Sequence, residues 1–320
     1  MRKPFLSCFA THLASYVELR QHLGLKFETQ AGVLYRFDRY VHAQQYHGPL
    51  TQDVAIAYAM HAAHLTPLGR SRQYGMLCNF SHYLAAFVPD TPLLDPHALA
   101  AKPYRPVPYI FTEEELGRLL HLAKTLPYYP IRRATLHAMI ALVMTTGLRC
   151  SEVIHLDRAD VDLTSGVLHI RQTKFYKERL VPVHPTTLAV LQDYARVRDV
   201  TYQHLSTPAF FISMYRTRFS RHTLSLAFRP LARAMGFSGQ DGPRPTLHSL
   251  RHTFAVRRLE AWYTEGQDVQ ALLPSLATYL GHVHYTDTAY YITATPRLLT
   301  LAAARADTAW LAQATMEVPE

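Results

Sequence analysis

The chain has 320 residues and a hydrophobic content of 48%, which is enough for two globular domains with sizeable cores. Its 33 Lys and Arg residues exceed its 24 Asp and Glu residues, and the resulting charge of +9 favours an anionic partner. No secretory signal, no apolar run of membrane-spanning length and no paired cysteines occur, so we expect a cytoplasmic protein without disulfides or a membrane partner.

The first 88 residues predict a compact helical domain. Four segments carry apolar residues near i, i+3, i+4 and i+7, which is the repeat of an amphipathic helix, and Gly or Pro separates them. These segments are residues 5–24, 29–48, 51–65 and 69–89. We therefore expect helices that bury their apolar faces against one another.

Residues 89–110 are rich in proline and show little periodicity. This composition predicts an extended linker between separately folded domains. The second domain then covers residues 111–320. Residues 101–320 hold 25 basic and 18 acidic residues, a net charge of +7, so most of the basic excess falls in this second part.

The second domain begins with a clear helix signal. Thr112 is a good N-cap, and Glu115 completes a capping box three positions later, so a helix is predicted from about residue 113. Residues 132–147 are strongly apolar, which predicts a buried helix that ends at Gly147 in the C′ position.

Two β-type runs, residues 166–174 and 178–185, are separated by a short polar turn and predict an antiparallel hairpin. The rest of the chain returns to a helical pattern, in residues 221–236, 246–263, 272–281 and a tail from residue 297 to about 315. The predicted fold class is therefore mainly α with a small antiparallel β-sheet in the second domain.

His248 and Arg251 lie three apart after Thr246, a plausible N-cap, and so share a face of the first helical turn. An imidazole and a guanidinium beside free helix N–H groups suit an anion. The alternative is that His248 caps the helix locally and Arg251 pairs with an acid on the surface.

Arg149 follows the buried helix and its glycine turn, which should hold the side chain in a partly enclosed place. A buried arginine needs an anion. Glu152 can be that anion in a plain internal salt bridge, or it can orient Arg149 and leave part of the donor fork free for a ligand phosphate. Lys174 at the hairpin tip is either simply solvated or able to reach a DNA groove and protonate a departing oxygen.

The stretch "LGHVHYTDTAYYITATP" at residues 280–296 concentrates histidines and tyrosines. It is open to three interpretations: a metal site, an aromatic patch in a core, or a reactive tyrosine. His282 and His284 lie two apart, as at some metal sites, but no cysteine or further ligand set is near them. Tyr285, Tyr290 and Tyr291 are the candidate nucleophiles.

Taken in order, these positions resemble the tyrosine recombinase or phage integrase family, from residue 111 to residue 299. The motifs that carry the resemblance are "TTGLRCSEV", "KFYKERLVPV", "LHSLRHTFA" and "YLGHVHYTDTAYYI". The six positions that match are Arg149, Lys174, His248, Arg251, His282 and Tyr291. A longer segment between Arg251 and His282 resembles the branch of integrases that serve mobile elements.

The resemblance implies that Arg149 and Arg251 clamp a scissile phosphate, with Glu152 in support of Arg149. It also implies that His248 and His282 add hydrogen bonds and proton handling, and that Lys174 is the general acid for the 5′-oxygen. Tyr291, nine residues beyond His282, would form a 3′-phosphotyrosine link, which leaves Tyr285 and Tyr290 with packing roles. No metal, ATP or other cofactor is then required.

Simple energetics favour this assignment of roles. Ionising a free tyrosine, with a pKa near 10, costs roughly 4 kcal/mol at neutral pH. Two guanidinium groups around a phosphodiester favour the phenolate and stabilise the charge of the transition state.

We therefore expect a site-specific recombinase or integrase that acts on double-stranded DNA with specific sites. Its alternatives are the same chemistry used for topoisomerase-like relaxation or resolution, an inactive DNA-binding paralogue, or an ordinary basic helical protein. The resemblance further implies a C-shaped clamp of a helical core-binding domain and a catalytic domain around DNA. It implies a tetramer, with itself or with related recombinases, and association with the bacterial nucleoid.

Overall fold

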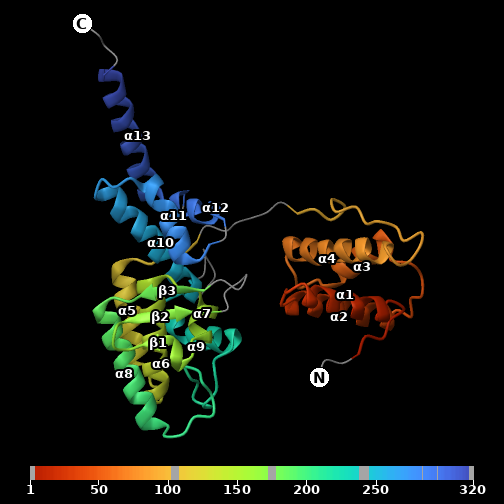
Figure 1. Cartoon of the computed structure of the whole chain (residues 1–320), viewed down its shortest axis with the longest axis horizontal. Coiled ribbons are helices and arrows are strands. Elements are labelled where there is room, and N and C mark those ends of the chain that lie inside the picture. The colour runs from red at the N-terminus through yellow and green to blue at the C-terminus, as the bar shows by residue number, and fades with distance from the viewer. Residues whose placement is uncertain are drawn as a thin grey trace. The chain divides into compact units, whose positions relative to one another are not determined.

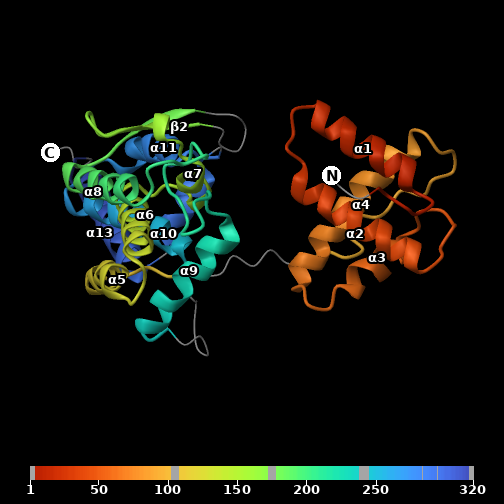
Figure 2. The same cartoon turned by 90° about the horizontal axis from the view of Figure 1, so that it is seen from below.

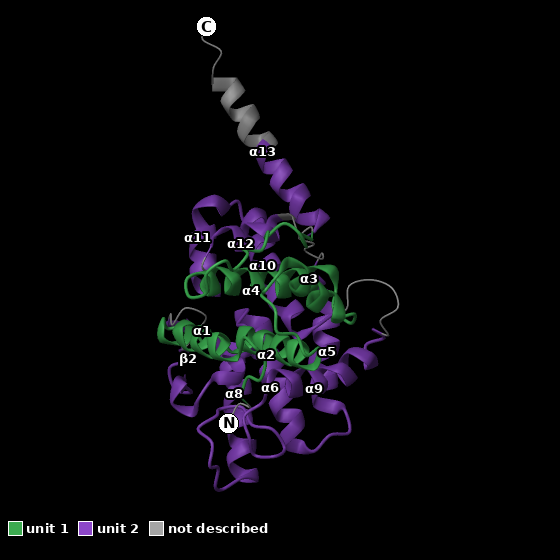
Figure 3. Ribbon diagram, turned by 90° about the vertical axis from the view of Figure 1, so that its right-hand side faces the viewer, with its two compact units in different colours: residues 1–105 green, residues 106–320 purple. Residues whose placement is uncertain are grey.

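The computed structural model describes residues 4–101, 108–171, 178–237, 245–282, 284–293 and 295–316. The chain divides into two compact units, residues 1–105 and residues 106–320, which have different colours in Figure 3. The described residues are mainly helical with one small antiparallel sheet, which confirms the predicted fold class (Figure 1). None of the described helices has both the length and the apolar character that crossing a bilayer requires.

The first unit is built from four helices around a single core (Figure 2). They are α1 (Ala10–His22), α2 (Glu28–Ala43), α3 (Gln52–His61) and α4 (Pro67–Ala85). Helix α4 contacts the other three, and the core is filled by side chains such as Leu13, Leu34, Phe37, Leu77 and Phe80. The amphipathic repeats thus predict these helices correctly.

Polar side chains fix where two helices of the first unit begin and hold the start of the chain against a third. Thr51 and Thr66 cap α3 and α4 by accepting hydrogen bonds from backbone N–H groups three residues ahead. Asp38 of α2 is fully buried and accepts hydrogen bonds from the backbone N–H groups of Leu6 and Ser7. Charge-assisted bonds of this kind tie the start of the chain to α2.

The ends of the proline-rich stretch pack on the two units. Leu94 is 2% exposed and belongs to the core of the first unit, and Tyr74 donates a hydrogen bond to the carbonyl of Asp95 at 2.7 Å. At the other end, the Phe111 N–H donates to Thr253 Oγ1 at 2.9 Å. The extended linker at residues 89–110 stays a prediction. Residues 102–107 lie outside the described part.

The second unit is assembled around α6, whose neighbours are α5, α8 and α10. Its helices are α5 (Glu113–Thr125), α6 (Pro130–Thr146), α7 (Cys150–His155), α8 (Pro185–Thr201), α9 (Arg221–Ala234), α10 (Leu247–Thr264), α11 (Val269–Leu280), α12 (Thr286–Ala289) and α13 (Pro296–Met316). A short 3₁₀ helix, η2 (Tyr290–Thr293), joins α12 to the segment before α13. Helix α13 packs on α10, and its Leu298 is fully buried.

Three strands form the sheet, in the order β1 (Val161–Asp162), β2 (Val167–Ile170) and β3 (Arg179–Pro182). Strands β2 and β3 pair antiparallel, with Leu168 opposite Val181, so the predicted hairpin is confirmed. Its tip, with Lys174, lies outside the described residues. The two-residue strand β1 carries no alternating pattern long enough to predict it.

Local signals place the ends of two important helices. Thr112 and Glu115 exchange the two hydrogen bonds of a capping box at the start of α5. Gly147 ends α6 with φ +63°, and a Cβ at this position would lie 2.5 Å from the Phe254 ring. Only glycine satisfies both the backbone conformation and the close approach.

Candidate active site

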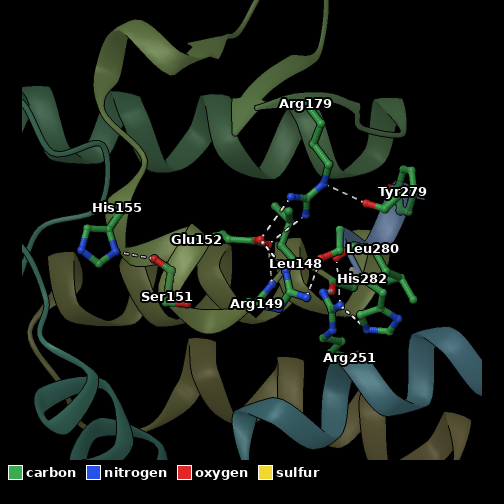
Figure 4. Close-up of polar contacts among 12 residues, drawn as sticks. Leu148, Arg149, Ser151, Glu152, His155, Arg179, Arg251, Tyr279, Leu280 and His282 are labelled. Atoms are coloured by element: carbon green, nitrogen blue, oxygen red, sulfur yellow. Dashed lines mark hydrogen bonds and ion pairs between the residues drawn. The ribbon is translucent and has the colours of Figure 1, made fainter. Parts of the chain in front are cut away.

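Arg149 is held at the start of α7, directly after the turn that ends α6. Its Nη1 donates to Glu152 Oε1 at 3.0 Å, and its Nη2 donates to the carbonyl of Gly281 at 2.7 Å (Figure 4). The side chain keeps 28% of its surface exposed. Arg149 is therefore fixed in direction but still open to a ligand, as its partly enclosed position predicted.

Glu152 is a buried carboxylate shared by two arginines. Arg179 of β3 donates to both of its oxygens, at 3.1 and 2.9 Å, and both guanidinium groups point at it in Figure 4. Burial raises the pKa of Glu152, but the hydrogen bonds and charge of Arg179, followed by those of Arg149, outweigh it and hold the pKa below its usual range. Glu152 is thus an internal salt-bridge partner that also orients Arg149.

Arg251 is 1% exposed and lies where two helices end. Its Nη1 donates to the carbonyl of Gly147 at 2.7 Å, and its Nη2 donates to that of Leu280 at 2.9 Å. These carbonyls close α6 and α11, whose C-terminal ends carry partial negative charge. The surface ion pair considered for Arg251 is therefore wrong, because the side chain is buried against carbonyl groups.

The region around Arg251 and Glu152 carries more positive than negative charge. Burial and the charge of Arg149 lower the pKa of Arg251 to about 10, which leaves the guanidinium charged near pH 7. Three guanidinium groups, those of Arg149, Arg179 and Arg251, lie in this region, and the carboxylate of Glu152 pairs with the first two. An added anion would be stabilised here.

His282 lies between Arg251 and α12. Its Nε2 is 2.8 Å from Arg251 Nη2, and its Nδ1 is 2.6 Å from Thr288 Oγ1. Because a guanidinium can only donate, Nε2 is the acceptor, and Nδ1 carries the hydrogen that is donated to Thr288. Burial, followed by the charges of Arg251 and Arg149, lowers the pKa of His282 to about 4, so the ring is neutral near pH 7.

His248 lies on the solvent side of the site. Its exposed ring packs against His252 with centroids 4.5 Å apart, and it lines an open pocket of about 890 Å³ beside Arg149. The hydrogen bond that begins α10 runs from the Thr246 N–H to Ser249 Oγ at 3.0 Å. Ser249, and not His248, therefore makes the local capping contact at the start of α10.

Tyr291 lies in η2 and is 3% exposed. Its Oη is 3.1 Å from His252 Nδ1. Burial raises the pKa of Tyr291, although the charges of Arg251 and Arg149 act in the opposite direction. The hydroxyl is therefore protonated near pH 7 in the free protein, and it faces the cations that would stabilise its ionised form.

The other candidates of the tyrosine-rich stretch are placed differently. Tyr285 is 55% exposed, and Tyr290 is half-buried beside the Tyr291 ring. His284 is exposed. Across the described residues, no three His, Cys, Asp or Glu side chains are grouped as a metal site would require.

The structure thus gathers Arg149, Glu152, Arg251, His282 and Tyr291 in one place, with His248 at its edge. Lys174 belongs to residues 172–177, outside the described part, so its position relative to the others stays a prediction.

Two residues at this site were not predicted to have a role. Arg179 lies two positions before Val181, the buried residue of β3, so the alternation of a strand already directs its side chain inward, toward an anion. His252 lies four residues after His248, and residues at that spacing share a helix face. Both signals were present in the sequence.

Comparisons with known proteins identify the relatives of this chain. Residues 110–297 match the phage integrase family. Two putative integrase/recombinases of Sinorhizobium fredii, y4rE and y4rB, are 42% and 36% identical to the chain. The first match covers 91% of this chain and 93% of y4rE, and the second covers 95% of this chain and 99% of y4rB.

The fold is shared with a solved structure of the Tn1549 transposon integrase in complex with circular intermediate DNA. That match has a TM-score of 0.64 and 20% identity, and it covers 94% of this chain and 99% of the integrase chain. The family match spans more than half of the chain, and y4rE and y4rB match it over nearly their whole length. The chain therefore belongs to the phage integrase family of recombinases, as its sequence motifs predicted.

Proposed function

We propose that this protein cuts and rejoins DNA at specific sites through a covalent 3′-phosphotyrosine intermediate formed by Tyr291. Arg149 and Arg251 bind the scissile phosphate, and Lys174 is the general acid for the 5′-oxygen. His248 and His282 add hydrogen bonds and proton handling around the phosphate. The reaction needs neither a metal ion nor ATP.

The observation that carries this proposal is the buried hydroxyl of Tyr291 beside an unbalanced group of guanidiniums. Arg251 contacts helix-terminal carbonyls, and the carboxylate of Glu152 is already shared by Arg149 and Arg179. A phosphodiester would supply the missing negative charge. The same cations then stabilise the charge that builds on phosphorus as the phenol oxygen attacks.

The proposed step conserves bonds and protons. The Tyr291 oxygen bonds to phosphorus and gives up its proton to a basic group of the site, while the P–O5′ bond breaks and the departing 5′-oxygen takes a proton from Lys174. The energy of the broken phosphodiester is retained in the phosphotyrosine, so that a 5′-hydroxyl can reverse the step. Joining to a different strand gives recombination, whereas joining to the same strand after rotation gives relaxation.

Double-stranded DNA is the proposed partner, and its backbone charge matches the net charge of the chain. The first unit is proposed as the core-binding domain that completes a clamp around DNA. A tetramer on DNA and the service of a mobile element are further parts of this proposal. The solved Tn1549 integrase, a transposon enzyme bound to DNA, has the same fold.

Covalent capture tests the proposal whatever the target sequence is. A pool of nicked duplexes with randomised sequence around the nick is incubated with the protein in EDTA and without ATP, and then denatured in detergent. We expect a protein–DNA adduct that resists denaturation, because the nick releases a short fragment and prevents rejoining. Sequencing the captured strands identifies the site.

Two variants make the result specific. Tyr291→Phe should abolish the adduct, while Tyr290→Phe, a matched change at the neighbouring position, should retain it. Cleavage that requires Mg²⁺ and leaves no adduct, or an adduct that survives in Tyr291→Phe, contradicts the proposal. Plasmids that carry the captured site then distinguish strand exchange from relaxation by their products.

A further inference from the structure

His252 contacts the proposed nucleophile, yet it is not among the six residues that the sequence motifs single out. Its Nδ1 lies 3.1 Å from Tyr291 Oη, and the two ring centroids are 5.4 Å apart. His252 directly follows Arg251 on α10, and its half-buried ring also packs edge-on against His248.

The direction of this hydrogen bond follows from the groups around the hydroxyl. Arg251 faces Oη and lowers the pKa of Tyr291 against the effect of burial. A guanidinium has only donors, so Arg251 cannot take the phenolic proton and can only favour negative charge on Oη. His252 Nδ1, at 3.1 Å from Oη, is placed to accept that proton in the tautomer that carries its hydrogen on Nε2.

His282 is less able to take this proton. Its ring lies parallel to that of Tyr291 at 6.2 Å, but both of its nitrogens are already engaged. Nε2 accepts from Arg251 at 2.8 Å, and Nδ1 donates to Thr288 at 2.6 Å. Accepting the Tyr291 proton would require His282 to give up one of these bonds.

Resting on the function proposed above, we propose that His252 is the proton acceptor for Tyr291 during strand cleavage. As Oη bonds to phosphorus, its proton passes to Nδ1 of His252, and the electrons of the P–O5′ bond leave with the 5′-oxygen. Lys174 protonates that oxygen. In rejoining, the 5′-hydroxyl attacks phosphorus and returns its proton to Lys174, and the released phenolate takes its proton back from the His252 imidazolium.

The charges around His252 decide when its ring can accept the Tyr291 proton. Its titratable or charged neighbours are His248 and Arg251 on the same helix, Tyr291 on η2, and His282 after α11. Burial, followed by His248, Arg251 and His282, lowers the pKa of His252 to about 4, so the free protein holds a neutral ring and a neutral phenol. Negative charge that builds on the phosphorus oxygens favours the imidazolium, so proton transfer is coupled to attack.

Two duplexes of the captured sequence separate this role from that of the leaving-group acid. One duplex has the normal 5′-bridging oxygen at the cleaved position, and the other has sulfur there, which departs as a thiolate without a proton. His252→Asn keeps an oxygen near the place of Nδ1 but cannot take up a proton at neutral pH. In single-turnover cleavage it should be slower by about 10²- to 10⁴-fold on both duplexes.

The matched comparison is Lys174→Ala, which should be slow on the oxygen duplex and restored on the sulfur duplex. His121→Asn, the same change at an exposed position of α5, should cleave both at the unaltered rate. Restoration of His252→Asn by sulfur would assign His252 to the leaving group and overturn the proposal. A rate within about twofold of the unaltered protein would reduce His252 to a hydrogen-bond partner and overturn it as well.

Separate control experiments distinguish a folding defect from a loss of function. Each variant is checked for its thermal unfolding midpoint and for duplex binding, and His252→Ala is assayed with added imidazole. Recovery that follows the titration of free imidazole supports a proton acceptor, and a folded, DNA-binding His252→Ala that imidazole does not restore contradicts it. If the unaltered protein forms no adduct, the proposed function is wrong. If it forms the adduct and His252→Asn cleaves DNA at the same rate, only the role of His252 is wrong.

Discussion

At the residue scale, the neighbours of each side chain in the site decide which of its atoms donate and which accept hydrogen bonds. Arg251 can only donate and is enclosed by carbonyls and His282, so the tautomer of His282 follows from it. Thr288, fully buried on α12, completes the arrangement by accepting from His282. The hydroxyl of Thr288 therefore links α12, the helix before Tyr291, to His282.

Replacing Thr288 by Val should remove that acceptor while nearly keeping the shape of the side chain. The Nδ1–H of His282 would then be buried without a partner, at a cost of about 1 to 3 kcal/mol of unfolding free energy. Nitrogen chemical shifts of the His282 ring report its tautomer, and urea unfolding reports the stability. Thr288→Ser keeps the hydroxyl and should keep the tautomer, so a change of tautomer in the Ser variant would contradict this account.

Glu152→Gln should destabilise the second unit by on the order of 3 kcal/mol. Gln has no charge, and its NH₂ group is a donor where Glu152 has an acceptor oxygen, so Arg179, whose side chain is 13% exposed, loses its anion. Urea unfolding measures the effect. Asp193→Asn removes an exposed ion pair with Arg196 and should hardly change stability, so a similarly small loss for Glu152→Gln would show that the buried pair is not stabilising.

At the scale of elements, α6 holds the second unit together and also prepares the site. Its apolar side chains pack against α5, α8 and α10, and the carbonyl of its C-cap residue, Gly147, accepts a hydrogen bond from Arg251. The left-handed turn at Gly147 then directs the chain into Arg149. A buried helix therefore positions both arginines that are proposed to bind phosphate.

His137 of α6 should make the protein sensitive to acid. Burial, followed by the charge of Lys124 and opposed by that of Asp193, lowers the pKa of His137 to about 4, whereas in the unfolded chain it is near 6.5. Only the unfolded state takes up a proton between these values, so stability is fully present above pH 6.5 and is lost as the pH falls toward 4.

The loss attributable to His137 between pH 7 and pH 5 should be about 1 to 2 kcal/mol. Denaturant unfolding of the protein and of His137→Leu at both pH values measures it as the difference in their pH dependence. The histidines of the site titrate in the same direction in both proteins and cancel in that difference. Identical pH dependence in the two would contradict the buried, neutral state of His137.

At the scale of the whole molecule, the charge of the chain and the arginines of α9 bear on DNA binding. Arg221 and Arg229 line the open pocket beside Arg149 and are exposed. Arg218 is instead engaged within the chain: it pairs with Asp157 and donates to the carbonyl of Ile154. Arg221 and Arg229 are therefore open to a ligand, whereas Arg218 is not.

Salt dependence of duplex binding should identify which arginines meet phosphates. Removing one contacted phosphate lowers the slope of log affinity against log salt by roughly 0.9, so Arg221→Ala and Arg229→Ala should each reduce the slope by that amount. Fluorescence anisotropy with a labelled duplex over a range of KCl concentrations measures it. Arg196→Ala, on α8 and paired with Asp193, should leave the slope unchanged; equal slopes in all variants would exclude the α9 arginines from the interface.

The features that the sequence by itself determined depend on residues that are close together in the chain. Helix periodicity, the capping box at Thr112 and the glycine that ends α6 depend on residues only a few positions apart, so they were predicted correctly. The ordered motifs also predicted the family and most of the residues that meet at the site. Roles for Arg179 and His252 were missed although strand and helix spacing hinted at them.

Only the tertiary structure decided how these residues meet. Arg251 reaches a carbonyl 104 positions away, Arg179 meets a carboxylate 27 positions earlier, and His252 meets a hydroxyl 39 positions later. Such contacts depend on how α6, α10 and α11 pack, and packing is set by the whole core rather than by any short pattern. The sequence could therefore indicate a buried arginine that needs an anion, but only the fold places it against two helix ends, with Tyr291 and His252 beside it.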